Sequence, residues 1–187
     1  MVVTYCFIIR KNYIKIEISD EIMITFKEAL KILNESKEFK QWKKKNPSTY
    51  LSHGFLIIES TDYNWKIGYY DRKKDKLTSF DVGRKITIEP EEEVFKKEKT
   101  KKVEKIDLDK VKLDLSEAVA ISKQLQEEEY ATENPTKIIA ILQKIDVGQV
   151  WNITYLTQNF NTLNFKIKTE TGRVLEKKLT GLMEFKK

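Results

Sequence analysis

The feature that most constrains the fold is an order of elements that occurs twice along the chain. Residues 25–82 have the pattern of a helical stretch followed by aromatic-rich strands, and residues 114–183 repeat that pattern. A broken amphipathic helix buries its apolar face most readily by lying across an antiparallel sheet. We therefore predict an α+β fold with two similar units, each a broken helix packed on an antiparallel β-sheet.

The first unit is predicted to contain two short helices between Thr25 and Lys45. Thr25 and Glu28 have the spacing of a capping box, Ser36 can cap a second helix, and Pro47 stops it. Three strands are predicted to follow, over residues 55–60, 65–71 and 76–82.

The second unit is predicted to open with a helix capped by Asp114 and Glu117. Asn134 and Pro135 have the residue types that begin helices, so we expect a second helical segment there, ending before Gly148. Its buried face would consist of Ile138, Ile139, Ile141, Leu142 and Ile145. Strands are expected over residues 150–156, 163–169 and 173–183, the last two joined by a turn at 171–172.

Composition suggests a division of the chain into two units and a connector. Residues 1–90 form the predicted N-terminal α+β unit, including an alternating pattern at 2–9 and 13–19 that indicates a β-hairpin. Residues 91–105 contain mixed lysine and glutamate, which indicates a charged connector or an edge strand. Residues 106–187 form the predicted C-terminal unit.

Several short stretches of the second unit resemble the PepSY domain family. Ala118 lies in the predicted helix, Trp151-Asn152-Ile153 opens a strand, and residues 165–175 read FKIKTETGRVL. This resemblance implies a cystatin-like helix-on-sheet fold, often duplicated, with a non-enzymatic regulatory or inhibitory role that is commonly extracytoplasmic. The chain departs from the family in that we expect no secretion signal and find no acidic residue at the place expected near Lys168, although Asp71 occupies the comparable place in the first unit.

Residue types that carry chemistry are few. Cys6 is the single cysteine, which excludes an intramolecular disulfide and favours a reducing compartment. His53 is the single histidine, so no histidine-based metal cluster can form, and a surface or packing role is favoured. The sequence has no glycine-rich phosphate loop and no apolar stretch of membrane-spanning length. We expect no catalytic residue, no metal and no cofactor, in a cytoplasmic protein that does not enter a membrane. The abundance of lysine and isoleucine is typical of thermophiles and also of a biased genome.

The net charge of +6 is unevenly distributed, and this distribution favours the first half of the chain as a binding region. Residues 1–90 carry about +5 and residues 91–187 about +1, with a lysine cluster at 37–45. Lysines can neutralise phosphates while nearby aromatic rings stack on bases. The candidate binding residues are Lys40, Trp42, Lys43, Lys44, Lys45, Tyr63, Trp65 and Tyr70. The same aromatic residues would also fill a helix-on-sheet core, and arginine, the usual base-reading residue, is nearly absent from the cluster.

These observations favour a non-catalytic binding or regulatory interaction module whose ligand is unknown. A protein partner or self-association is the expected mode of action. The alternative is a basic, nucleic-acid-associated protein that uses the cluster from Lys37 to Lys45.

Overall fold

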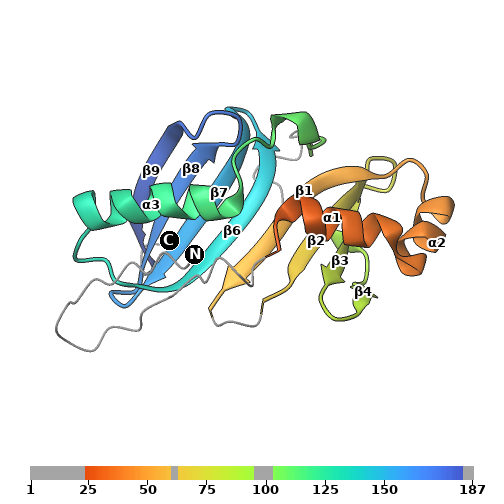
Figure 1. Ribbon diagram of the computed structural model, residues 1–187, viewed down its shortest axis with the longest axis horizontal. Coiled ribbons are helices and arrows are strands. Elements are labelled where there is room, and N and C mark those ends of the chain that lie inside the picture. Colours follow the sequence, from red (N-terminus) through yellow and green to blue (C-terminus); the bar gives the residue numbers. More distant parts are fainter. Residues whose placement is uncertain (1–23, 60–62, 95–102, 183–187) are drawn as a thin grey trace, which may run out of the picture.

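A computed structural model describes residues 24–59, 63–94 and 103–182. The described residues form three α-helices, one short 3₁₀ helix and a nine-stranded antiparallel sheet (Figure 1). The predicted hairpin at 2–9 and 13–19, and Cys6 within it, lie outside the described residues. The predicted α+β class is confirmed.

The elements follow one another in a simple order. The helices are α1 (Phe26–Glu35), α2 (Lys37–Lys45), the 3₁₀ helix η1 (Leu108–Lys110) and α3 (Leu115–Glu129). The strands are β1 (Tyr50–Ile58), β2 (Trp65–Asp71), β3 (Lys76–Val82), β4 (Ile86–Ile88), β5 (Glu92–Glu93), β6 (Pro135–Ile145), β7 (Gly148–Thr157), β8 (Asn161–Lys168) and β9 (Val174–Gly181).

One sheet runs through both halves of the chain in the order β4-β3-β2-β1-β6-β7-β8-β9, with β5 also paired to β3. The halves meet where β1 pairs with β6, from His53 opposite Gln143 to Ile58 opposite Ile138. We call residues 24–94 the first wing and residues 103–182 the second wing. The first wing has two α-helices and the second has one among the described residues, and a duplication is not confirmed. The predicted unit boundary at 91–105 stays a prediction.

The predicted helix after Asn134 is wrong, because residues 135–145 form strand β6. Ile138, Ala140 and Leu142 are buried on the face toward the helices, and the residues between them lie on the other face. A central strand with apolar residues on both faces has a nearly continuous apolar run, which a helical spacing also fits. Pro135 is tolerated because it is the first residue of the strand. Strand β1 also begins at Tyr50, earlier than predicted.

The three helices cover the same face of the sheet (Figure 1). The ring of Phe26 in α1 lies against Gly54 of β1, where an added Cβ would be only 2.4 Å from the ring. The Ser122 hydroxyl of α3 lies 2.7 Å from the Tyr155 hydroxyl of β7. The strand register places Gly54, Leu142 and Trp151 side by side on this face. In the described part of the chain, no helix lies on the opposite face.

The helices begin where the sequence predicts. The Thr25 amide donates to the Glu28 carboxylate at 2.7 Å, and the Glu28 amide donates to the Thr25 hydroxyl at 3.2 Å. Ser36 accepts from the Phe39 amide at 3.1 Å, so one serine ends α1 and begins α2. The Asp114 amide donates to Glu117 at 2.8 Å at the start of α3. These bonds satisfy N–H groups that a helix terminus leaves without an intrahelical partner.

Three aromatic rings join the two wings at the centre of the core. Phe26 lies edge-on to Trp65 at 5.4 Å and to Trp151 at 6.4 Å, and the two indoles are 6.1 Å apart. Each of the three is at most 1% exposed. Because Trp151 belongs to the second wing and the other two belong to the first, the wings share one hydrophobic core.

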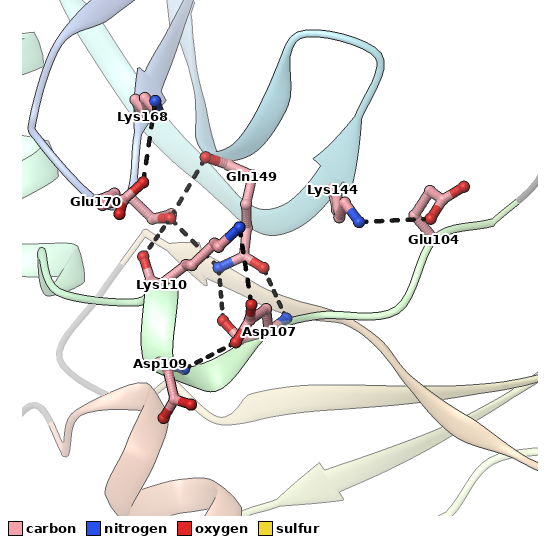
Figure 2. Close-up of polar contacts among 9 residues, drawn as sticks. Glu104, Asp107, Asp109, Lys110, Lys144, Gln149, Lys168 and Glu170 are labelled. Atoms are coloured by element: carbon pink, nitrogen blue, oxygen red, sulfur yellow. Dashed lines mark hydrogen bonds and ion pairs between the residues drawn. The ribbon is translucent and has the colours of Figure 1, made fainter.

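The segment 103–113, which we call the strap, opens the second wing and bonds to the first, where the Ile106 amide donates to the Leu51 carbonyl at 3.0 Å. It buries Ile106 and Val111, each 2% exposed. The Asp107 amide donates to Gln149 Oε1 at 2.8 Å, and Gln149 Nε2 donates back to the Asp107 carbonyl at 3.0 Å (Figure 2). Thr169 adds a bond from its hydroxyl to the Lys110 carbonyl at 2.8 Å. The buried glutamine thereby pairs with the strap as a neighbouring strand would.

Candidate functional site

The lysines of α2 do not act as one uniform basic surface. Lys40 Nζ donates to the Glu35 carbonyl at 2.8 Å, and Lys43 Nζ donates to the Thr49 hydroxyl at 3.0 Å. Burial lowers the pKa of Lys43 from its ordinary value. Lys44 and Lys45 are exposed to solvent. Of the four lysines predicted to bind, Lys40 and Lys43 therefore also hold the backbone around α2, whereas Lys44 and Lys45 are exposed to solvent.

The predicted aromatic partners of these lysines belong largely to the interior. Trp42 is half-buried, with its ring 4.9 Å from Phe80 and 5.7 Å from Tyr69. Trp65 is 1% exposed, and its indole N–H donates to the Ile24 carbonyl at 2.8 Å. Tyr63 is half-buried against the core. These contacts stabilise the first wing and leave little ring surface for stacking on a base.

Tyr70 lies on the opposite face of the sheet from Trp65, because side chains alternate along β2. It is 4% exposed, its hydroxyl donates to Asp75, and its ring meets Tyr50 edge-on at 5.6 Å. The structure therefore does not bring the eight predicted binding residues onto one surface.

His53 lies on the helix-free face of β1. Its ring covers Gly68 so closely that a Cβ there would be 2.0 Å from the ring. Its Nδ1 is 3.2 Å from the Ser52 hydroxyl, which also reaches the Gly68 carbonyl at 3.0 Å. Burial lowers the pKa of His53 to about 4, so the imidazole is neutral at pH 7. The histidine serves to pack the sheet.

The helix-free face carries a strip of apolar side chains where the wings meet. We call Phe55 and Ile57 of β1, with Ile139 and Ile141 of β6, the open strip. Phe55 pairs with Ile141 and Ile57 with Ile139, so the four side chains share one face. Ile57 is 38% exposed and the other three are half-buried.

Polar side chains border the open strip on the second wing. Asn152 lies opposite Ile141 and Thr154 opposite Ile139 across the β6–β7 pair. Asn164 Nδ2 donates to both, at 2.7 Å to Asn152 Oδ1 and 2.7 Å to Thr154 Oγ1. An apolar centre beside hydrogen-bonded neutral side chains resembles the core and rim of a protein interface.

The open strip is not apparent from the sequence, because the apolar residues at 135–145 also fit the spacing of a helix. Reading that stretch with a period of two puts Ile139 and Ile141 on one face and Ile138, Ala140 and Leu142 on the other. The alternation with a period of two is present in the sequence, but only the pairing of this stretch with β1 shows that it applies.

Several acidic side chains in the described segments form ion pairs with lysines. Glu91 accepts from Lys74 at 2.9 Å, and Glu129 accepts from Lys177 at 2.5 Å. Within these segments no group of three or more histidine, cysteine, aspartate or glutamate side chains could hold a metal ion. Among the described residues, none of the helices combines the length and the apolar composition that a membrane-spanning helix requires.

Comparison with known proteins does not assign the chain to a family. No protein-family model matches the chain, and no curated protein matches it either. A solved structure described as a "putative lipoprotein" from Clostridium difficile 630 has a TM-score of 0.49 and 16% sequence identity. The match covers 76% of this chain and 90% of the other. The PepSY resemblance therefore stays one between short motifs.

Proposed function

We propose that this protein is a non-catalytic binding or regulatory interaction module that holds a protein partner against its open strip. The observation that carries the proposal is the pairing of Phe55 with Ile141 and of Ile57 with Ile139 on the helix-free face. Three helices bury the opposite face, whereas Ile57 keeps 38% of its surface in contact with solvent.

Physical chemistry favours a protein as the occupant of this surface. Burying the exposed parts of four large apolar side chains is favourable by roughly 25 cal/mol per Å² of apolar area. The neutral Asn152, Thr154 and Asn164 can exchange hydrogen bonds with a partner without the cost of desolvating a charge. The resemblance of the second wing to PepSY motifs favours the same class of function.

Charge introduced on this face tests the proposal. The double variant Ile57→Lys/Ile139→Lys should fold, because both side chains point away from the helix-covered core. We expect it to lose a partner that wild-type protein retains from extracts of the native host. The matched control is Ile32→Lys, which alters an apolar side chain that is 44% exposed on α1. Retention of the partner by the double variant, or its equal loss by the control, would contradict the proposal.

A nucleic acid is the second candidate ligand, favoured by exposed Lys44 and Lys45 at the end of α2. With the nearby rings largely buried, binding would depend on phosphate contacts alone and would weaken steeply with salt. Lys44→Glu/Lys45→Glu should then abolish retention on single-stranded DNA or RNA at low salt. Lys177→Glu/Lys178→Glu on β9 is the control. Nucleic-acid binding would be excluded if the wild-type protein were not retained on DNA or RNA, or if its retention did not depend on salt.

A further inference from the structure

One end of the second wing is formed by three segments that are joined by hydrogen bonds. They are residues 130–136, 156–162 and 179–182, which we call the uncharged end. The Gln158 amide donates to the Asn134 carbonyl at 2.9 Å, and the Leu182 amide donates to the Phe160 carbonyl at 2.9 Å. Asn159 Nδ2 donates to the Thr132 carbonyl at 3.0 Å. This end includes the β7–β8 turn and the connection from α3 to β6 (Figure 1).

These segments are almost free of charge in a chain in which 34% of residues are charged. Their one charged residue is Glu133, which is 6% exposed. Its carboxylate accepts from Thr157 Oγ1 at 2.7 Å and from Asn161 Nδ2 at 3.0 Å. The carboxylate therefore orders the turn from inside, and these segments present only neutral groups to solvent.

Phe160 projects from this surface and is 74% exposed, the largest value among the exposed large hydrophobic residues described. Its φ of 56° lies in the left-handed region, which favours glycine and asparagine and disfavours an aromatic residue. Leu182, whose backbone bonds to it, is 40% exposed. A three-residue hairpin loop ends on a left-handed residue, which accounts for the backbone conformation at Phe160 but not for the choice of an exposed aromatic side chain there.

The turn that carries Phe160 is held in place. The Phe160 amide donates to the Thr157 carbonyl at 3.1 Å, and the Asn161 amide donates to the Thr157 hydroxyl at 3.3 Å. The same hydroxyl donates to buried Glu133. An aromatic side chain on an ordered turn loses little conformational entropy on binding, as is typical of the anchor residues of interfaces.

We propose that a second copy of this chain binds at the uncharged end, with Phe160 from both copies at the centre of a two-fold interface. A two-fold dimer places the same surface on both sides, so any charge near the axis would meet its own copy. The net charge of +6 makes two copies repel each other, and a neutral surface is where they can approach at least cost. Aromatic enrichment and depletion of charge are the marks of an interface core.

This dimer is independent of the proposed partner at the open strip. The open strip lies on the helix-free face at the β1–β6 junction, whereas Phe160 lies in the β7–β8 turn. Failure of one proposal therefore leaves the other standing.

Sedimentation velocity of the full chain over a wide concentration range tests the dimer. Wild-type protein should self-associate reversibly, and Phe160→Asn should weaken association at least ~10-fold, the loss expected of an anchor residue. Asparagine accepts a positive φ, so this variant should melt at or above the wild-type temperature. The control is Val147→Asn, which changes a side chain that is 57% exposed in the β6–β7 turn, at the opposite end of the same strand β7.

Salt and cross-linking give two further readouts. Higher salt should leave the dimer unchanged or strengthen it, because screening reduces the repulsion between copies. A photo-cross-linking p-benzoylphenylalanine at position 160 should attach to residues 130–136, 156–162 or 179–182 of a second copy. The proposal would be overturned if wild-type protein stayed monomeric at every concentration or if Val147→Asn weakened association as much as Phe160→Asn. It would also be overturned if salt weakened the dimer or if the cross-links formed elsewhere. Binding of monomeric wild type to neutral phosphatidylcholine vesicles would overturn it in favour of a lipid surface.

Discussion

The helices of the two wings cover the same face of the sheet but pack on it through different kinds of side chain. In the first wing, two short helices pack through large rings, with Phe39 at 4.9 Å from Tyr69 and 5.3 Å from Phe80. In the second wing, one long helix approaches β7 through small residues, and Ala118 and Ser122 are both 0% exposed. Wide rings keep helices at a distance from a sheet, whereas small residues allow close contact and buried hydrogen bonds.

This difference shows how order is achieved in each wing. Apolar contacts are not directional, so the ring contacts of the first wing depend on shape and volume, beside a few directional bonds such as that from the Trp65 indole to the Ile24 carbonyl. The second wing adds directional contacts, such as Gln126 Nε2 to the Glu133 carbonyl at 2.9 Å and the bonds of Gln149 to the strap. We therefore expect that removing one hydrogen-bond partner in the second wing lowers the free energy of unfolding by more than the lost apolar contact area predicts.

The largest effect should come from breaking the aromatic junction that the wings share. Trp151→Ala leaves a cavity beside Phe26 and Trp65 and should lower the free energy of unfolding by about 3–5 kcal/mol. Because the wings share a core, the variant should still unfold in one transition. Urea denaturation followed by circular dichroism and by fluorescence measures both points. Two separated transitions would show that the wings are independent.

Acid should destabilise the first wing through His53, the single histidine of the chain. The folded-state pKa of about 4 lies below the ordinary value of 6.5. Stability is therefore full above pH 6.5 and is lost as the pH falls from 6.5 toward 4, by at most about 3 kcal/mol. Urea midpoints at pH 7 and pH 4.5 should differ less in His53→Gln than in wild type. An unchanged difference would assign the acid sensitivity to other groups.

A buried hydroxyl pair tests the polar packing of the second wing. Ser122→Ala removes the partner of the Tyr155 hydroxyl and should cost about 1–3 kcal/mol. Adding Tyr155→Phe removes the stranded hydroxyl and should recover much of that loss. A double-mutant cycle by thermal and chemical denaturation measures the coupling. Additive effects would mean that the pair contributes packing alone.

The smallest difference should lie between the helix starts of the two wings. Thr25 both accepts from and donates to Glu28, so Thr25→Ala should cost about 1 kcal/mol. At Asp114 the reciprocal bond runs from the Asp114 backbone amide, which alanine retains, so Asp114→Ala should cost less. Hydrogen exchange of the first-turn amides in the two variants compares the caps directly. A larger effect at Asp114 would contradict this ranking.

Local signals in the sequence predicted local structure well. The caps at Thr25, Ser36 and Asp114 and the turn at Gly172, whose φ is 71°, follow from side chains and backbone conformations within four residues of one another. Strands β2 and β3 were predicted with the bounds that the structure has. Such features need no knowledge of the rest of the chain.

Non-local contacts could not be predicted. The isoleucine-rich stretch at 135–145 fits a period of 3.6 as well as one of two, and its pairing with β1 decides between them. The same pairing creates the open strip. Burial of Trp65 and Tyr70 on opposite faces likewise depends on which elements cover each face, so the predicted cluster of binding residues could not be tested from spacing alone.

Pairing between β1 and β6 also has a consequence for synthesis on the ribosome. Strand β1 ends at residue 58, but its neighbour on one side is complete only at residue 145. At ordinary rates of translation, this edge of β1 stays unpaired for on the order of ten seconds, until β6 has been synthesised. An edge with apolar side chains on both faces is a template for aggregation, so the nascent first wing is the stage at which we expect a chaperone to be needed.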